Sequence, residues 1–233
     1  MSPPRSLDAA RVHGLPSTAY YVPDFISSDE ERHILARIAS APKPSWKQLT
    51  HRRLQSWPFP LLNDKLLDAP LPSWLEDPVV PRLLSLSVSK TDERHLFSQS
   101  PHARPNHVLI NEYPPGVGIM AHKTAPPTGL YNDGGALDPT PAWRILQEPR
   151  SLLITTESLY MDYLHGIAGV AEDVQLSAES IVNWPLLGNP DAYAVGSNVR
   201  GLRTSLTYRD VVKVSRAGSK LGLNLVSKGA SAK

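Results

Sequence analysis

The stretch that decides the fold is "NHVLINEYPPGVGIMAH", which occupies positions 106–122. Its first half places apolar side chains among polar alternates, which is typical of a strand that buries one face. The segment "PPGVG" that follows supplies residues that turns favour. We therefore predict a strand over 106–113, followed by a turn and by an apolar run that ends at His122.

The length and composition are those of an ordinary globular chain. Its 233 residues suit one domain with a small appendage. With 24 basic and 22 acidic residues the net charge is only +2, so nucleic-acid binding would need a local basic surface. There is no cysteine, which excludes disulfides, thiolate zinc sites and cysteine nucleophiles. We expect an intracellular protein of the cytoplasm or nucleus, without a secretory signal or a membrane-spanning segment.

The predicted elements are short, because 23 residues are proline, well above the usual share of about 5%. Proline is excluded from the interiors of helices and central strands. Ser28 and Glu31 form a capping-box pattern, which predicts a helix that starts there. We further predict strands at 19–26 and 150–156 and a pair of strands at 201–214. A helix is expected near 78–87, and a helix or turn at 157–167. An ordered loop or ribbon is expected at 42–60 and a loop over 171–198.

Two histidines and two arginines point to chemistry through their order along the chain. A single histidine after an apolar run is usually structural, and an alternating arginine strand is usually a solvated sheet face. Here His122 precedes His165, and Arg203 and Arg209 follow on one late strand. Two imidazoles and a carboxylate form the facial triad of non-haem iron oxygenases. Two guanidiniums on one strand face suit a dicarboxylate, which arginine binds through paired hydrogen bonds.

Seven segments are informative as a set: "YYVPDFIS", "APKPSWKQL", "RRLQSWP", "NHVLINEYPPGVGIMAH", "EPRSLL", "DYLHGI" and "RTSLTYRDV". Together they resemble the AlkB family of Fe(II)/2-oxoglutarate dioxygenases, and its sixth branch most of all, over roughly residues 19–214. The resemblance implies a mainly β fold with flanking helices (α+β), in which the core is a double-stranded β-helix, or jelly roll. It also implies Fe(II), 2-oxoglutarate as co-substrate, and oxidative dealkylation or hydroxylation, with nucleic acid as the expected partner.

The resemblance assigns roles to residues and boundaries to segments. His122 and His165 match the metal ligands, and no catalytic residue is implied beyond the ligands. The expected segments are a flexible arm at 1–18, an extension and substrate lid at 19–105, the jelly-roll core at 106–214 and a disordered tail at 215–233. The positions matched to co-substrate binding are Asn111, Tyr113, Arg203, Ser205 and Arg209, and those matched to the substrate lid are Arg52, Arg53 and Trp57.

The family pattern breaks directly after His122. The acid ligand would stand at position 124, where this chain has Thr124. A neutral hydroxyl is a poor replacement for an anionic oxygen ligand on a hard divalent ion. The following stretch "KTAPPTGLYNDGGALDPTPAW", residues 123–143, lacks two strands that the resemblance leads us to expect. The predicted jelly roll is therefore incomplete.

Three interpretations of this break remain open. The chain is an aberrant product of a gene whose normal protein is active, or it is a catalytically inactive protein that keeps the fold and binds nucleic acid or a protein. In the third interpretation Asp133 or Asp138 replaces the missing acid. A structural jelly roll of the cupin kind, unrelated to iron, is a further alternative that the order of the motifs disfavours.

Overall fold

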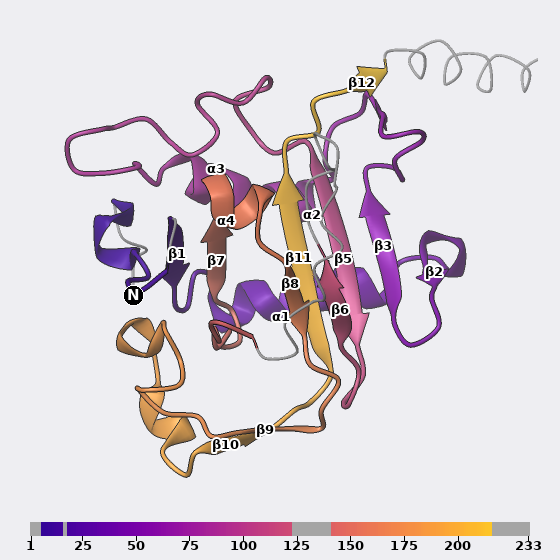
Figure 1. Cartoon of the computed structure of the whole chain (residues 1–233). Helices are drawn as coiled ribbons and strands as arrows, with labels where there is room; N and C mark the ends of the chain where they lie inside the picture. Colours follow the sequence, from indigo (N-terminus) through magenta and orange to yellow (C-terminus); the bar gives the residue numbers. More distant parts are fainter. Residues whose placement is uncertain (1–5, 16–17, 123–140, 216–233) are drawn as a thin grey trace, which may run out of the picture. The chain divides into compact units, whose positions relative to one another are not determined.

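A computed structural model describes residues 6–15, 18–122 and 141–215 (Figure 1). The chain divides into two compact units, both discontinuous in sequence. Unit 1 contains Met1–Glu31, Val88–Asp92 and Tyr113–Arg203, whereas unit 2 contains Arg32–Ser87, Glu93–Glu112 and Thr204–Lys233. The described elements are mainly strands with a few short helices, which confirms the predicted fold class at that level. Within these residues the strands form one four-stranded and four two-stranded sheets, and none of the sheets closes into a barrel.

Unit 2 is built on the four-stranded sheet. Its strand order is β11 (Arg203–Arg209), β5 (His107–Tyr113), β3 (Arg53–Trp57) and β2 (Lys47–Gln48). The predicted alternation in β5 is confirmed, because Val108 and Ile110 are fully buried. The region predicted as a ribbon or ordered loop at 42–60 forms the β2–β3 hairpin. The remaining elements of this unit are the 3₁₀ turn η2 (Lys43–Ser45) and the parallel pair of β4 (Leu66–Leu67) and β12 (Val214–Ser215).

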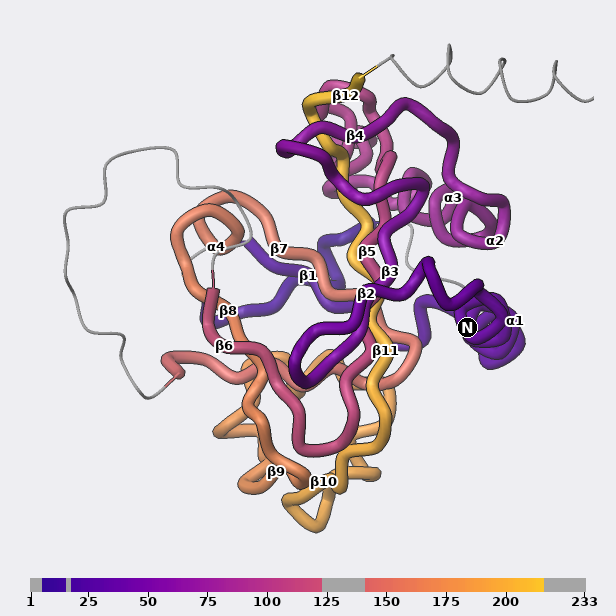
Figure 2. The backbone as a smooth tube through the Cα atoms, turned by 90° about the vertical axis from the view of Figure 1, so that its right-hand side faces the viewer, coloured from indigo at the N-terminus to yellow at the C-terminus, as the bar shows by residue number. Residues whose placement is uncertain are grey.

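Three helices cover one face of this sheet: α1 (Ser28–Ala39), α2 (Ser73–Glu76) and α3 (Val79–Leu84) (Figures 1 and 2). The fully buried side chain of Gln55, on β3, ties α1 to the sheet by donating Nε2 to the carbonyl oxygen of Ile38 at 3.1 Å. This bond satisfies a carbonyl of the last helical turn, which has no partner within its own helix.

The predicted capping box of α1 is wrong by one residue. Ser27 and Glu30 exchange the two capping hydrogen bonds, at 2.7 and 3.2 Å. Ser28 is already the first helical residue, so the cap has to precede it. The carboxylate of Glu31 instead accepts a hydrogen bond from Arg150 at 3.2 Å.

Unit 1 contains three antiparallel ribbons and a small apolar core. They are β1 (Ala19–Val22) with β7 (Leu152–Thr155), β6 (Ile119–His122) with β8 (His165–Ile167), and β9 (Glu172–Val174) with β10 (Ser197–Val199). The core cluster contains Val12, Ala19, Tyr21, Leu146, Leu176, Ile181, Leu187 and Tyr193. The other elements are α4 (Glu157–Met161) and the 3₁₀ turns η1 (Leu7–Ala10), η3 (Trp184–Leu186) and η4 (Pro190–Tyr193).

The prediction of a structureless loop over 171–198 is wrong, because that segment contains β9, η3, η4 and most of β10. The buried side chain of Asn183 organises it. Asn183 accepts a hydrogen bond from the Leu146 amide at 2.9 Å and donates one to the Leu146 carbonyl at 2.8 Å. One side chain thus satisfies both backbone groups of a buried residue, as a neighbouring strand would. No helix in the described parts of the chain is long and apolar enough to cross a bilayer.

The β6–β8 ribbon depends on glycine. A Cβ atom at Gly118 would overlap the carbonyl oxygen of Ile167, and one at Gly166 would lie 2.9 Å from that of Ile119. We expect Gly118→Ala to lower the free energy of unfolding by about 1–3 kcal/mol, because the backbones must separate to admit the methyl group. Urea titration measures the change.

Gly201→Ala is the matched control, since a Cβ atom there would meet nothing within 4 Å. Equal unfolding free energies for the two alanine variants would show that β6 and β8 do not approach as described.

Candidate functional site

The two histidines predicted as metal ligands lie directly opposite each other. His122 ends β6 and His165 begins β8, and the antiparallel register pairs the two residues. Their ring centres are 4.3 Å apart and the ring planes are inclined by 53°. A cross-strand pair on one face of a ribbon brings its side chains together, so the register alone explains this contact.

The environment of the pair favours the neutral form of His165. Burial lowers the pKa of His165, and the neighbouring His122 acts in the same direction. Nδ1 of His122 lies 2.9 Å from the carbonyl oxygen of Met120. Because a carbonyl oxygen only accepts, Nδ1 carries the proton and Nε2 keeps the lone pair that a metal would use.

The described residues fit only part of the iron centre that the resemblance implies. They contain no group of three His, Cys, Asp or Glu side chains that could hold a metal ion. Two imidazoles are therefore present without the anionic ligand of a facial triad. Thr124, Asp133 and Asp138 lie outside the described residues.

Arg203 and Tyr113, both predicted to bind the co-substrate, meet within unit 1. The Arg203 guanidinium lies 5.5 Å from the centre of the Tyr113 ring. It also donates a hydrogen bond of 2.6 Å to the side-chain oxygen of Gln147, a residue that sequence reasoning missed. Burial lowers the pKa of Arg203, Tyr113 opposes this shift, and the positive charge of Arg200 adds to it.

The other predicted co-substrate residues are in unit 2. Asn111 is buried on β5, and its side-chain oxygen accepts a hydrogen bond of 3.3 Å from Arg52. A residue predicted for the substrate thus contacts one predicted for the co-substrate. Nε of Arg209 lies 3.2 Å from Nδ1 of the buried His107. Ser205 lies partly buried on β11.

Two predicted lid residues on the β2–β3 hairpin, Trp57 and Arg53, lie in different environments. Trp57 is directed inward: its indole N–H donates to Gln55 at 2.9 Å, and its ring packs edge-on against Trp74. Arg53 is directed outward and keeps 44% of its side chain exposed. Its guanidinium lies 4.1 Å from the centre of the Trp46 ring.

Glu112 holds this arginine in place. Arg53 and Glu112 are paired across β3 and β5, and their side chains form an ion pair of 2.7 Å. Sequence reasoning included neither Trp46 nor Glu112 in the site. The alternation of β5 could have indicated Glu112, whereas Trp46 precedes β2 and no periodicity marks it.

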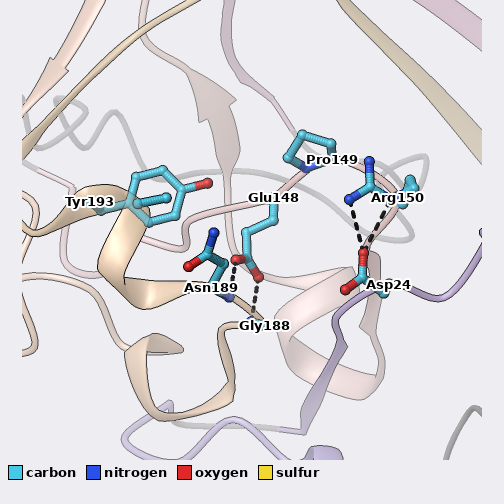
Figure 3. A pocket seen from close by; sticks show the side chains of 8 residues that line it. Asp24, Glu148, Pro149, Arg150, Gly188, Asn189 and Tyr193 are labelled. Atoms are coloured by element: carbon cyan, nitrogen blue, oxygen red, sulfur yellow. Dashed lines mark hydrogen bonds and ion pairs between the residues drawn. The ribbon is translucent and has the colours of Figure 1, made fainter. Parts of the chain in front are cut away.

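A cavity of about 270 Å³ in unit 1 is lined by polar groups that are hydrogen-bonded within the fold (Figure 3). The Glu148 carboxylate accepts hydrogen bonds from the backbone amides of Gly188 and Asn189, at 2.8 and 2.9 Å, and from the Tyr21 hydroxyl at 2.9 Å. Burial raises the pKa of Tyr21, so this phenol remains a neutral donor. Arg150 on the same cavity wall pairs with Asp24. The Glu148 bonds anchor the segment between η3 and η4, and Arg150 is occupied by its ion pairs with Asp24 and Glu31.

Relatives of known name match most of this chain. It is 36% identical over 231 residues to "Probable RNA/DNA demethylase ALKBH6" of Danio rerio, an alignment that covers 89% of this chain and 91% of the relative. This chain belongs to the AlkB family. As an AlkB protein it resembles ALKBH6 more than ALKBH8 among these matches, in agreement with the resemblance seen in its motifs.

Two more distant AlkB relatives are named "tRNA (carboxymethyluridine(34)-5-O)-methyltransferase", from Xenopus tropicalis and Macaca fascicularis. They are 27% and 28% identical to this chain. The alignments cover 84% and 86% of this chain but only 32% and 31% of the relatives, so this chain spans about a third of their length. No family model matches the sequence.

The neutral state of His107 predicts a pH dependence of stability. Burial, assisted by the charge on Arg209 and opposed by the backbone of Phe59, lowers the pKa of His107 to about 4. The unfolded chain takes up this proton near pH 6.5, whereas the folded chain does so only near pH 4. Stability is therefore lost as the pH falls from about 6.5 towards 4, by roughly 2 kcal/mol at pH 5.

His107→Asn tests this prediction, because an amide oxygen accepts from Arg209 as Nδ1 does but takes up no proton. Urea titrations at pH 7 and pH 5 should show a smaller loss of stability in the variant. An unchanged loss would mean that His107 is not the group responsible.

Proposed function

We propose that this chain is, by descent, an Fe(II)- and 2-oxoglutarate-dependent dioxygenase of the AlkB type that acts on alkyl groups of nucleic acid. The observation that carries the proposal is the cross-strand pair of His122 and His165. Two imidazoles that face each other can supply two of the three ligands of a facial triad. The jelly-roll architecture is part of this proposal, and ALKBH6, the relative of similar length, is named as a probable RNA/DNA demethylase.

The roles proposed for the residues follow their chemistry. His122 and His165 would supply two ligands to the iron, which with 2-oxoglutarate and O₂ provides the oxidising power of this enzyme class. Arg203 pairs with a carboxylate of the co-substrate, since arginine stays charged even when it is buried. Tyr113, in contact with Arg203, limits the positions that the guanidinium can take. Asn111, Ser205 and Arg209 match co-substrate-binding positions of the family by resemblance alone.

A second candidate function is nucleic-acid binding without turnover. It is favoured by the absence of a third ligating side chain in the described residues, together with the neutral Thr124. The outward face of the lid would carry this binding, because the Arg53 guanidinium lies over the Trp46 ring and still reaches solvent. A planar guanidinium of this kind stacks on nucleobases.

An acidic residue introduced at position 124 distinguishes the two candidate functions. We expect Thr124→Asp to increase the Fe(II)-dependent conversion of 2-oxoglutarate to succinate at least about tenfold, because a carboxylate completes the facial triad. Thr124→Asn has nearly the same shape without the charge and should leave turnover near that of the unaltered chain. Chromatographic measurement of succinate provides the readout.

Turnover that survives His122→Gln/His165→Gln in the Thr124→Asp background would refute the dioxygenase assignment. If Thr124→Asp and the unaltered chain are both inert while nucleic acid still binds, binding without turnover is the function.

The lid predicts a specific pattern of binding to single-stranded oligonucleotides. Arg53→Lys keeps the positive charge but removes the planar guanidinium that could stack on a base. We therefore expect the affinity for the oligonucleotide to fall about fivefold or more, equivalent to the loss of one stacked base. The slope of log affinity against log salt should not change, because the charge is conserved. Fluorescence anisotropy at several salt concentrations measures both quantities.

Arg37→Lys makes the same chemical change at an exposed position on α1 and should leave affinity unaltered. Equal effects of the two substitutions on affinity would show that the lid is not part of the binding surface.

A further inference from the structure

Two arginines only three positions apart have partners that differ in charge. Arg200 donates two hydrogen bonds to the carboxylate of Asp173, at 2.9 and 2.5 Å. Arg203, the first residue of β11, donates from Nη2 to the side-chain oxygen of Gln147 at 2.6 Å. A carboxylate neutralises the guanidinium that it binds, whereas an amide oxygen orients the guanidinium and leaves its charge in place. The charge of Arg200 is therefore compensated by its partner, while Gln147 only orients Arg203.

The backbone on both sides of Gln147 is held by other segments of unit 1. The amide and carbonyl of Leu146 are bonded to the buried side chain of Asn183, at 2.9 and 2.8 Å. The carboxylate of Glu148 accepts hydrogen bonds of 2.8 and 2.9 Å from two backbone amides between η3 and η4. Leu146 belongs to the apolar core cluster, whereas Gln147 is exposed. Gln147 is thus presented to Arg203 by a backbone that is already fixed, which lowers the entropic cost of orienting the guanidinium.

The surroundings of Arg203 favour an anion that can reach it. Burial is the largest influence and lowers the pKa of Arg203; Tyr113 acts against it, and the charge of Arg200 acts with it. A desolvated cation gains more from an approaching anion than from a neutral dipole. An amide at position 147 fixes the direction of the guanidinium without satisfying this demand for negative charge.

We propose that Gln147 is a positioning residue for the co-substrate, which holds the Arg203 guanidinium in the direction that pairs with a carboxylate. This inference rests on the proposed function, in which Arg203 pairs with a carboxylate of 2-oxoglutarate. It sets two requirements for the side chain at position 147. The side chain has to accept a hydrogen bond from Arg203, and it has to be neutral so that it does not compete with the ligand.

Two substitutions of Gln147 test these requirements separately. The affinity of the full chain for 2-oxoglutarate is measured by ligand-detected NMR, which needs no bound metal. Gln147→Leu should lower the affinity about fivefold, the effect of one lost hydrogen bond. Gln147→Glu should lower it at least about tenfold, because the new carboxylate pairs with Arg203 in place of the ligand. Gln99→Leu and Gln99→Glu make the same changes at an exposed position in unit 2 and should leave the affinity unaltered.

Urea unfolding separates positioning from a merely structural role. Gln147→Glu should unfold at no lower urea concentration than the unaltered chain, because a carboxylate beside a partly buried guanidinium compensates its charge. The expected result is therefore a variant that binds 2-oxoglutarate more weakly although its fold is not weakened. Unchanged affinity in Gln147→Glu, or an affinity that falls only together with stability, would overturn the inference.

Arg203→Met distinguishes the inference from the function on which it rests. If this variant binds 2-oxoglutarate as tightly as the unaltered chain, or if the unaltered chain does not bind it, the proposed co-substrate site is refuted together with the inference. If Arg203→Met binds more weakly while both Gln147 variants bind normally, the inference alone fails. Circular dichroism verifies that each variant folds.

Discussion

The backbones of β6 and β8 approach so closely that neither Gly118 nor Gly166 has room for a side chain. His122 faces His165 in this ribbon, although the register shifts between Ile119 and His122. A slip of one residue would turn His122 and His165 to opposite faces of the ribbon. No longer-range element is needed to explain why two imidazoles separated by over forty positions in the sequence meet with their ring centres 4.3 Å apart.

Local patterns in the sequence were sufficient where one face of an element is buried. The alternation in 106–113 correctly predicted β5, because its alternate apolar residues fill a core. The helix predicted to start at Ser28 is present as α1, although its capping box lies one residue earlier, at Ser27 and Glu30. Serine and acidic residues occur repeatedly around that helix start, so the sequence alone could not select which serine begins it. The family was recognisable from seven short motifs, since each carries a backbone or side-chain constraint.

Contacts between distant polar residues could not be predicted in this way. The ribbon of β9 and β10 leaves Val174 and Val199 mostly exposed, at 54% and 77%, so it has no buried stripe to reveal it. It is held instead by the ion pair of Arg200 with Asp173. Trp46 was also missed, because its contact depends on residues distant in the sequence. Its ring contacts Arg53, and Arg53 is positioned by an ion pair with Glu112 on another strand.

Arg200 and Arg203 differ in how their charge is compensated. Arg200 is compensated by Asp173, whereas the contacts of Arg203 within the described part of unit 1 are a neutral amide and a phenol ring. A partly buried guanidinium without a carboxylate is costly, and an incoming anion lowers that cost. Arg203 therefore favours an anionic ligand over a neutral one of the same shape, because only the anion offsets the desolvation of the cation.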